Sequence, residues 1–154
     1  MDENGTLILY DEQDTSLWNE DLIAKGGYFL RCAGTGDSLS RYHLEAAIAW
    51  WHTQTTDNDE KWQHILQLYD QLLQIAWSPM AALNRIFALS KVAGKMAAIP
   101  EAESLNMSGS HLYFTLLGEL YSGVDQEKAK QNFQTAFMLA SSNADKEIIR
   151  KKMV

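Results

Sequence analysis

Hydrophobic residues recur at helical spacing along most of this chain. The spacing i, i+3, i+4, i+7 is carried by two sets of residues that begin 34 positions apart (114 minus 80): Met80, Leu83, Asn84 and Phe87, then Phe114, Leu117, Gly118 and Tyr121. A partner pattern repeats after 64 positions (129 minus 65), with Ile65, Tyr69 and Leu72 returning as Ala129, Phe133 and Ala136. Residues at these spacings share one face of a helix, so the pattern predicts paired amphipathic helices.

A period near 34 residues is typical of tetratricopeptide-type helix pairs. Such pairs bury their apolar faces by stacking and leave a surface that suits binding to another protein. The predicted fold is therefore all-α, with antiparallel helical hairpins stacked in a tetratricopeptide-like (TPR-like) right-handed array. A protein-interaction module is the first hypothesis for its function.

Capping residues and helix breakers predict seven or eight helices, of which seven cover residues 15–30, 40–53, 61–75, 79–92, 110–121, 126–140 and 143–153. The predicted N-caps are Asp14 for the first helix, Asp57 or Asp59 for the third, Ser78 before Pro79 for the fourth, and Asp125 for the helix that begins at Gln126. Gly94 suits the position after the fourth helix. Pro100 is expected to interrupt a short helical turn at 96–99.

The segment before the first helix has a different character. Gly5 to Tyr10 is apolar and partly β-branched, which predicts one extended segment laid against the helices. The expected organisation is an extended lead-in at 1–14 followed by a single helical domain at 15–154.

Composition excludes several classes of partner. The chain has 154 residues, 46% of them hydrophobic, and 13 Lys and Arg against 20 Asp and Glu give a net charge of −7. Clustered positive charge is needed to bind phosphates, so direct binding of nucleic acid is not expected.

The longest apolar run, Ala46 to Trp51, is too short to cross a bilayer. No secretory signal begins the sequence, and Cys32 has no second cysteine to pair with, so we expect a cytoplasmic protein with no membrane association.

Catalytic and metal-binding motifs are absent from the sequence. The four histidines, His43, His52, His64 and His111, follow no metal-ligand spacing and have no cysteine companion. No nucleotide-binding or nucleophile motif occurs, and a lone cysteine is more often a small buried hydrophobe than a nucleophile. We therefore expect no catalytic residue, no metal and no cofactor, and a protein that is not an enzyme.

One set of polar residues is predicted to form a structural clamp: Gln13, Asp14, Asp59, Asn84 and Arg85. Arg85 lies beside the apolar face of the fourth predicted helix, where an unpaired guanidinium would be costly. We expect it to pair with Asp14 or Asp59, which would tie the lead-in to the helices. A ligand-binding role is the alternative, and a buried charge must be paired in either case.

Aromatic residues are the candidates for a binding surface. The five tryptophans, Trp18, Trp50, Trp51, Trp62 and Trp77, either form core or line a small-molecule pocket. Trp50 and Trp51 lie about 100° apart on a helix, so both cannot point fully inward. Trp50 or Trp77 is predicted to be partly exposed at a partner surface. Tyr42 and His52 complete the set of candidate partner- or ligand-binding residues.

Several short motifs together resemble the C-terminal extension found on one group of RNA polymerase sigma factors of the extracytoplasmic-function (ECF) subfamily. They occur in this order: Asp11-Glu12-Gln13-Asp14-Thr15-Ser16-Leu17-Trp18, Arg41 to Ala49 with His52, Asp59 and Trp62 leading into Ile65 and Leu68-Tyr69, and Ser78-Pro79 leading into Leu83-Asn84-Arg85. Three positions depart from the family pattern. Thr15 replaces an Arg, Glu60-Lys61 separates Asp59 from Trp62, and Lys95 replaces a Pro after Gly94.

The resemblance implies a non-enzymatic regulatory domain of, or acting on, an ECF sigma factor. Its expected partners are sigma-factor domains or an RNA polymerase-associated protein, and a freestanding copy could act as a negative effector. The match begins where the extension begins, so a regulatory piece without the promoter-reading regions is expected. The alternative is a small-ligand sensor that uses an aromatic cleft between hairpins. The sequence does not indicate an oligomeric state.

Overall fold

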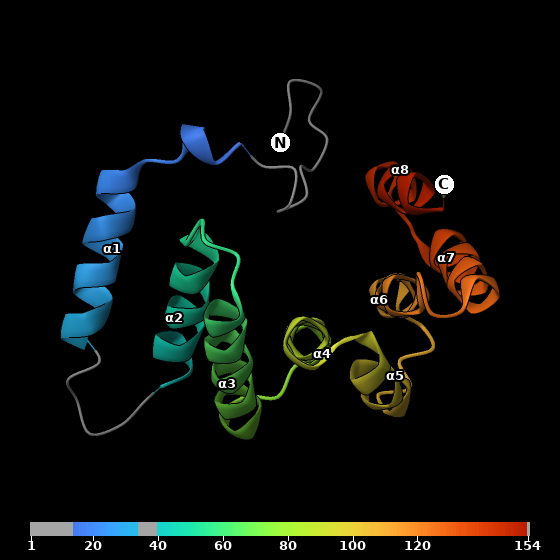
Figure 1. The fold of residues 1–154 in the computed structure, drawn as a ribbon, viewed down its shortest axis with the longest axis horizontal. Helices are drawn as coiled ribbons and strands as arrows, with labels where there is room; N and C mark the ends of the chain where they lie inside the picture. The colour runs from blue at the N-terminus through green and yellow to red at the C-terminus, as the bar shows by residue number, and fades with distance from the viewer. Residues whose placement is uncertain (1–13, 34–39, 154) are drawn as a thin grey trace. The chain divides into compact units, whose positions relative to one another are not determined.

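The computed structural model describes residues 14–33 and 40–153, and within them it contains eight α-helices, one short 3-10 turn and no β-strand (Figure 1). The predicted all-α class is confirmed. The helices are α1 (Glu20–Ala33), α2 (Arg41–Thr53), α3 (Asp59–Ile75), α4 (Pro79–Ala93), α5 (Lys95–Ser104), α6 (His111–Tyr121), α7 (Gln126–Leu139) and α8 (Asn143–Lys152). The extended segment predicted at 5–10 lies outside the described residues.

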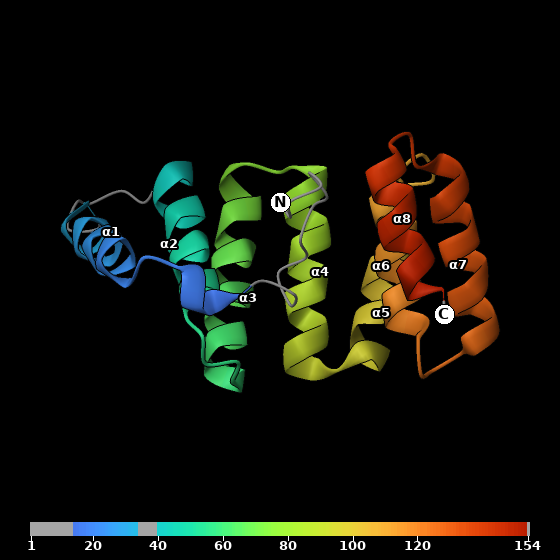
Figure 2. The same ribbon diagram turned by 90° about the horizontal axis from the view of Figure 1, so that it is seen from above.

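The helices fall into two compact units, which are described separately here. The first unit covers residues 14–92, and the described part of the second covers residues 93–153. The sequence had predicted one helical domain over 15–154. Within the first unit α1 packs on α2 and α2 on α3, and within the second α5, α6, α7 and α8 pack consecutively (Figure 2).

Most helices begin at a polar side chain that accepts a hydrogen bond from the first turn, which replaces a bond the helix itself cannot supply. The predicted caps Ser78 and Asp125 are confirmed, since Ser78 Oγ accepts from the Ala81 amide and Asp125 Oδ1 from the Lys128 amide. Asn58 caps α3, in place of the predicted Asp57 or Asp59. Asp57 accepts instead from the indole N–H of Trp62.

The first predicted helix, at 15–30, begins later than expected. Asp14 does cap a turn, but that turn is the 3-10 segment Thr15–Leu17, where Asp14 Oδ1 accepts from the Ser16 amide at 3.0 Å. α1 starts at Glu20, because the Asn19 side chain accepts from the Leu22 amide at 3.0 Å. It then continues to Ala33.

Pro100 does not end a helix, contrary to the sequence prediction. It lies inside α5 (Lys95–Ser104), which follows the positive-φ residue Gly94. The missing N–H removes one bond to the Met96 carbonyl. Burial of Ala98, Ile99 and Ala102 on the inner face of α5 offsets that loss.

The core of the first unit is an apolar cluster built mainly from α2 and α3: Leu44, Ile48, Trp62, Ile65, Tyr69 and Leu72, with Ala81 and Ala88 from α4. The shared apolar face predicted from Ile65, Tyr69 and Leu72 of α3 is therefore confirmed. The rings of Trp62 and Phe87 meet edge-on at 5.5 Å, which joins α3 to α4. α1 contributes one buried residue, Gly27.

In the second unit, α6 and α7 lie close together because a glycine faces an aromatic ring. A Cβ built on Gly118 would stand 2.6 Å from Cε1 of Phe133, so only the absence of a side chain lets the two helices approach this closely. The repeated positions on the two helices are buried or half-buried: Leu117, Gly118, Tyr121, Ala129, Phe133 and Ala136 buried, Phe114 half-buried. Leu117, Gly118 and Tyr121 therefore supply the α6 side of the contact, and Ala129, Phe133 and Ala136 supply the α7 side.

Hydrogen bonds from side chains also join α5 to α6. The hydroxyl of Tyr121 donates to Glu103 Oε1 at 2.6 Å, and this bond, together with burial, raises the pKa of Tyr121. Lys95 Nζ donates to the carbonyls of Glu119 and Ser122, both at 2.8 Å, which satisfies groups at the end of α6.

Replacing Gly118 with alanine should destabilise the chain by about 1–3 kcal/mol, because the new methyl group overlaps the Phe133 ring. Gly109→Ala is the control, since a Cβ there meets nothing within 4 Å. Urea unfolding followed by circular dichroism measures both variants. Adding Phe133→Leu to Gly118→Ala should recover part of the loss. Equal stability of Gly118→Ala and Gly109→Ala would contradict this packing.

Candidate functional site

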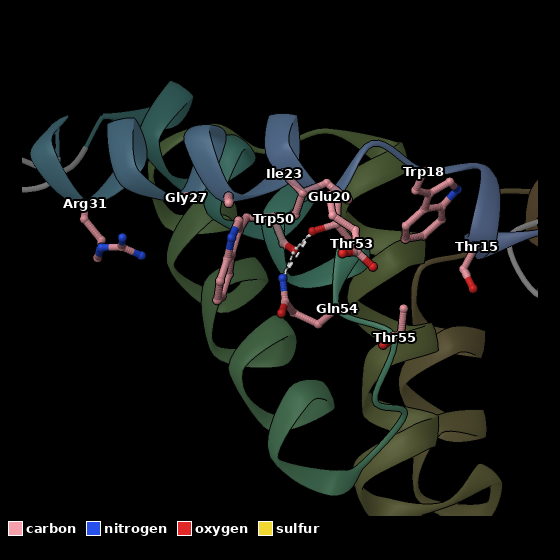
Figure 3. A pocket seen from close by; sticks show the side chains of 11 residues that line it. Thr15, Trp18, Glu20, Ile23, Gly27, Arg31, Trp50, Thr53, Gln54 and Thr55 are labelled. Atoms are coloured by element: carbon pink, nitrogen blue, oxygen red, sulfur yellow. Dashed lines mark hydrogen bonds between the residues drawn. The ribbon is translucent and has the colours of Figure 1, made fainter.

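A pocket of about 390 Å³ lies between α1 and α2 in the first unit (Figure 3). Its lining combines aromatic, hydroxyl, amide and charged side chains: Thr15, Trp18, Glu20, Ile23, Ala24, Gly27, Arg31, Trp50, Thr53, Gln54 and Thr55. We call this the α1–α2 pocket. Arg31 stands at one end of it and Thr15 at the other, with Trp50 between them (Figure 3).

The pocket exists because Trp50 fits against the backbone of α1. A Cβ built on Gly27 would stand 2.6 Å from Nε1 of Trp50 and 3.3 Å from its Cδ1. Any side chain at position 27 would therefore push the two helices apart. Gly27 lets the indole fill the space between the helices, and the ring forms one wall of the pocket.

Local contacts hold Trp50 and the end of α2 in place. The rings of Trp50 and Trp51 meet edge-on at 5.1 Å, and Trp51 stacks on His64 at 4.5 Å. Thr53 Oγ1 donates to the Trp50 carbonyl at 2.6 Å. Gln54 Nε2 donates to the same carbonyl at 3.3 Å and to Thr53 Oγ1 at 3.2 Å. The two bonds to the Trp50 carbonyl satisfy an acceptor at the helix end that lacks a backbone donor.

A second pocket, of about 400 Å³, also lies between α1 and α2 and is mostly apolar. It shares Ile23, Trp50 and Thr53 with the α1–α2 pocket, and its remaining lining is Leu22, Gly26, Leu30, Ala46 and Ala49. Small residues at Gly26, Ala46 and Ala49 leave this space open. Trp50 therefore borders both cavities, a polar one and an apolar one.

Two charged side chains line the α1–α2 pocket, Glu20 and Arg31. They lie eleven residues apart on α1, which is about 16 Å along a helix axis. Within the described part of the chain, neither side chain forms an ion pair or a hydrogen bond. The two charges thus face the pocket from separate positions.

The predicted contact residues divide between this site and the outer surface. Trp50 is half-buried and Trp77 is 64% exposed, so the predicted partial exposure is confirmed for both. Tyr42 is 77% exposed. Neither Tyr42 nor Trp77 lines either of these pockets. The structure therefore brings only Trp50, of the four candidates, to the α1–α2 pocket.

His52, the fourth candidate, is half-buried and its ring lies edge-on to Trp62 at 6.0 Å. Burial, and then the charge of nearby Lys61, lower the pKa of His52 below its ordinary value of 6.5. A neutral imidazole beside Trp62 is a packing contact. His52 does not line either pocket.

Arg85 forms an ion pair with a residue that the sequence analysis did not select. Its Nε donates to Oδ1 of Asp70 on α3 at 2.5 Å, whereas Asp14 or Asp59 had been predicted. Asp14 is occupied as a cap, accepting from the amide and hydroxyl of Ser16. Asp70 lies on α3, beside Arg85 on α4. Because both residues belong to helices, their positions relative to each other are fixed.

The other members of the predicted clamp have separate contacts. Asn84 hydrogen-bonds to Tyr69, whose pKa is raised by burial. Asp59 lies in the first turn of α3, where a negative charge favours the helix N-terminus. Gln13 lies outside the described residues. Among the described members, Asp14 caps a turn, Asn84 bonds to Tyr69 and Arg85 pairs with Asp70.

Sequence reasoning missed two residues that shape this region, Gly27 and Lys61. A Gly26-Gly27 pair inside a helical pattern is a signal of close approach by another element, and it could have identified Gly27. Lys61 is buried, and its Nζ donates to the Gln54 carbonyl at 2.7 Å. No pattern in the sequence marks a lysine whose partner is a backbone carbonyl.

Across residues 14–33 and 40–153, no three His, Cys, Asp or Glu side chains are grouped so that they could hold a metal ion. No helix in the same ranges is long and apolar enough to cross a membrane.

Comparison with known proteins finds a relative whose function is not described. A protein of Rhizobium meliloti (strain 1021), described only as uncharacterized, is 30% identical over 157 aligned positions. The match covers 99% of this chain and 37% of that protein, so the chain spans little more than a third of its relative's length. No protein-family model matches the chain, and no solved structure matches it.

Two adjacent glycines on α1 should respond differently to the same change. Gly27→Ala should lower the stability of the first unit and shift the NMR signal of the Trp50 indole, because the methyl group overlaps that ring. Gly26→Ala is the matched control, since a Cβ there meets nothing within 4 Å. The control should be neutral or stabilising by up to about 1 kcal/mol through helix propensity. Thermal unfolding and two-dimensional NMR compare the variants, and identical behaviour of the two would refute the contact.

Proposed function

We propose that this chain is a non-enzymatic regulatory domain of, or acting on, an RNA polymerase sigma factor of the ECF subfamily. It acts by binding the sigma factor through the helices of its first unit and so modulates the initiation of transcription. A freestanding copy would act as a negative effector by occupying a surface that the sigma factor needs. The TPR-like arrangement of the hairpins is part of this proposal.

The observation that carries the proposal is the exposed apolar surface of α1. Leu22 is 63% exposed and Phe29 is 67% exposed, and the two lie seven residues apart, on one side of the helix. Tyr28, also exposed, contacts Phe29 edge-on at 5.5 Å. Contiguous exposed apolar groups are typical of interaction sites.

Other observations agree with a helical repeat protein that forms part of a larger assembly. The Gly118–Phe133 contact brings α6 and α7 close together, which supports a stack of paired helices. In the Rhizobium meliloti protein the matching region is joined to a further 63% of chain (100 minus 37), as a sigma-factor extension would be. The motifs that resemble the ECF extension supply the proposed partner, and the net charge of −7 suits the basic DNA-binding regions of such a partner.

Binding to the cognate ECF sigma factor, prepared without its own extension, should occur with micromolar or tighter affinity. Phe29→Ser should weaken it about tenfold or more, because an exposed aromatic anchor is lost at the interface. Met138→Ser on α7 is the control, since Met138 is 74% exposed in the other unit. Isothermal titration calorimetry measures all three proteins, and circular dichroism checks that they remain folded.

Absence of binding at micromolar concentrations would contradict the proposal. Equal weakening by Phe29→Ser and Met138→Ser would contradict the assignment of the surface to α1. In vitro transcription with the sigma factor and core polymerase then gives the direction of the effect. A change in transcript yield is expected, and no change at saturating concentrations of the chain would exclude regulation of that sigma factor.

A further inference from the structure

Arg31 gives the α1–α2 pocket a positive charge that no described residue neutralises. It lines one end of the pocket, and among the described residues its side chain has no ion-pair or hydrogen-bond partner. Side chains on an α-helix lean toward its N-terminus. Arg31 lies one turn after Gly27, so its guanidinium leans over the part of α1 against which the Trp50 indole rests. Figure 3 shows Arg31 beside this part of the pocket.

Trp50 contributes a second donor to the lining of the pocket. Its Nε1 lies against Gly27, and no described residue accepts a hydrogen bond from it. Arg31 and Trp50 thus both line the pocket with donors that no described residue accepts from. Such a pair is complementary to an anionic oxygen group.

The surroundings limit which anion could bind. Glu20 lines the same pocket but lies about 16 Å from Arg31 along the helix, beyond the distance at which exposed charges interact strongly. A multiply charged phosphate group would need more than one cation, and Arg31 is the only Lys or Arg that lines this pocket in the described chain. The net charge of the chain is also negative. A singly charged carboxylate fits these conditions best.

The rest of the pocket is suited to an apolar or aromatic body. The faces of Trp50 and Trp18 and the side chain of Ile23 form its walls. A volume of about 390 Å³ lies within the usual range for small-molecule sites. The bonds that fix Thr53 and Gln54 at the end of α2 keep this wall in place without a ligand.

We propose that the α1–α2 pocket binds a small carboxylic acid with an apolar or aromatic body. The carboxylate accepts from the guanidinium of Arg31 and the indole N–H of Trp50, and the body lies against the faces of Trp50 and Trp18. This site does not depend on the proposed sigma-factor contact, which uses the exposed side chains Leu22 and Phe29. It gives the domain a means of responding to a metabolite.

The test uses 4-phenylbutyrate as the probe and its uncharged amide, 4-phenylbutyramide, as the matched compound. The acid should produce a saturable shift of the assigned Trp50 indole N–H resonance in two-dimensional NMR, and the amide should bind about tenfold or more weakly. In Arg31→Gln, affinity for the acid should fall to that of the amide. Lys25→Gln, an equal charge change on the same helix outside the pocket, should leave the affinity unchanged.

Three results would overturn the proposal. The first is no saturable shift at millimolar probe, and the second is equal affinity for the acid and the amide. The third is an equal loss of affinity in Arg31→Gln and Lys25→Gln, which would indicate general charge attraction. Arg31 and Lys25 are both exposed, and circular dichroism of each variant checks that the fold is intact. Sigma-factor binding is measured separately, so failure of one proposal does not decide the other.

Discussion

The contact between a glycine and an aromatic ring determines how closely the helices approach in both units. In the first unit Trp50 lies against Gly27, and in the second Phe133 lies against Gly118. In each case a single methyl group would overlap the ring, and tightly packed interiors have no space to absorb it. Hydrophobic spacing makes these segments helical, but the glycines set the distance between neighbouring helices.

The two contacts have different consequences because of what surrounds them. Phe133 is enclosed by the buried side chains of α6 and α7, so its contact with Gly118 is part of a core. Trp50 is only half-buried, and it lines two cavities. The same kind of packing therefore leaves the ring buried in the second unit and half-buried in the first. The exposed side chains of α1, on which the proposed partner contact depends, follow from this shallow packing.

Much of the helical structure could be predicted from the sequence, because helix starts and apolar faces are local features. Ser78-Pro79 and Asp125 fixed the beginnings of α4 and α7 through hydrogen bonds within a few residues. The error at Pro100 has a tertiary cause, since burial of the neighbouring Ala98 and Ile99 outweighs the loss of one backbone bond. The late start of α1 has a local cause, because Asn19 and not Asp14 caps this helix.

The site was less predictable, because its geometry depends on residues far apart in the sequence. Local pattern identified Trp50 as a residue that could not turn fully inward, and it does line the pocket. It did not identify Gly27, which lies twenty-three positions earlier and acts only by lacking a side chain. The Arg85 prediction failed for a similar reason. Charge alone indicates that a partner is needed, whereas the packing of α3 on α4 selects Asp70.

The most direct test of this account is the NMR distance between Gly27 and Trp50 in the unmodified chain. The structure places the indole Nε1 and Cδ1 against the Gly27 backbone, so nuclear Overhauser effects are expected between the Gly27 α-protons and the indole ring protons. Strong cross-peaks between these protons are the predicted result. A Trp50 indole that shows such effects only to residues outside α1 would contradict the account.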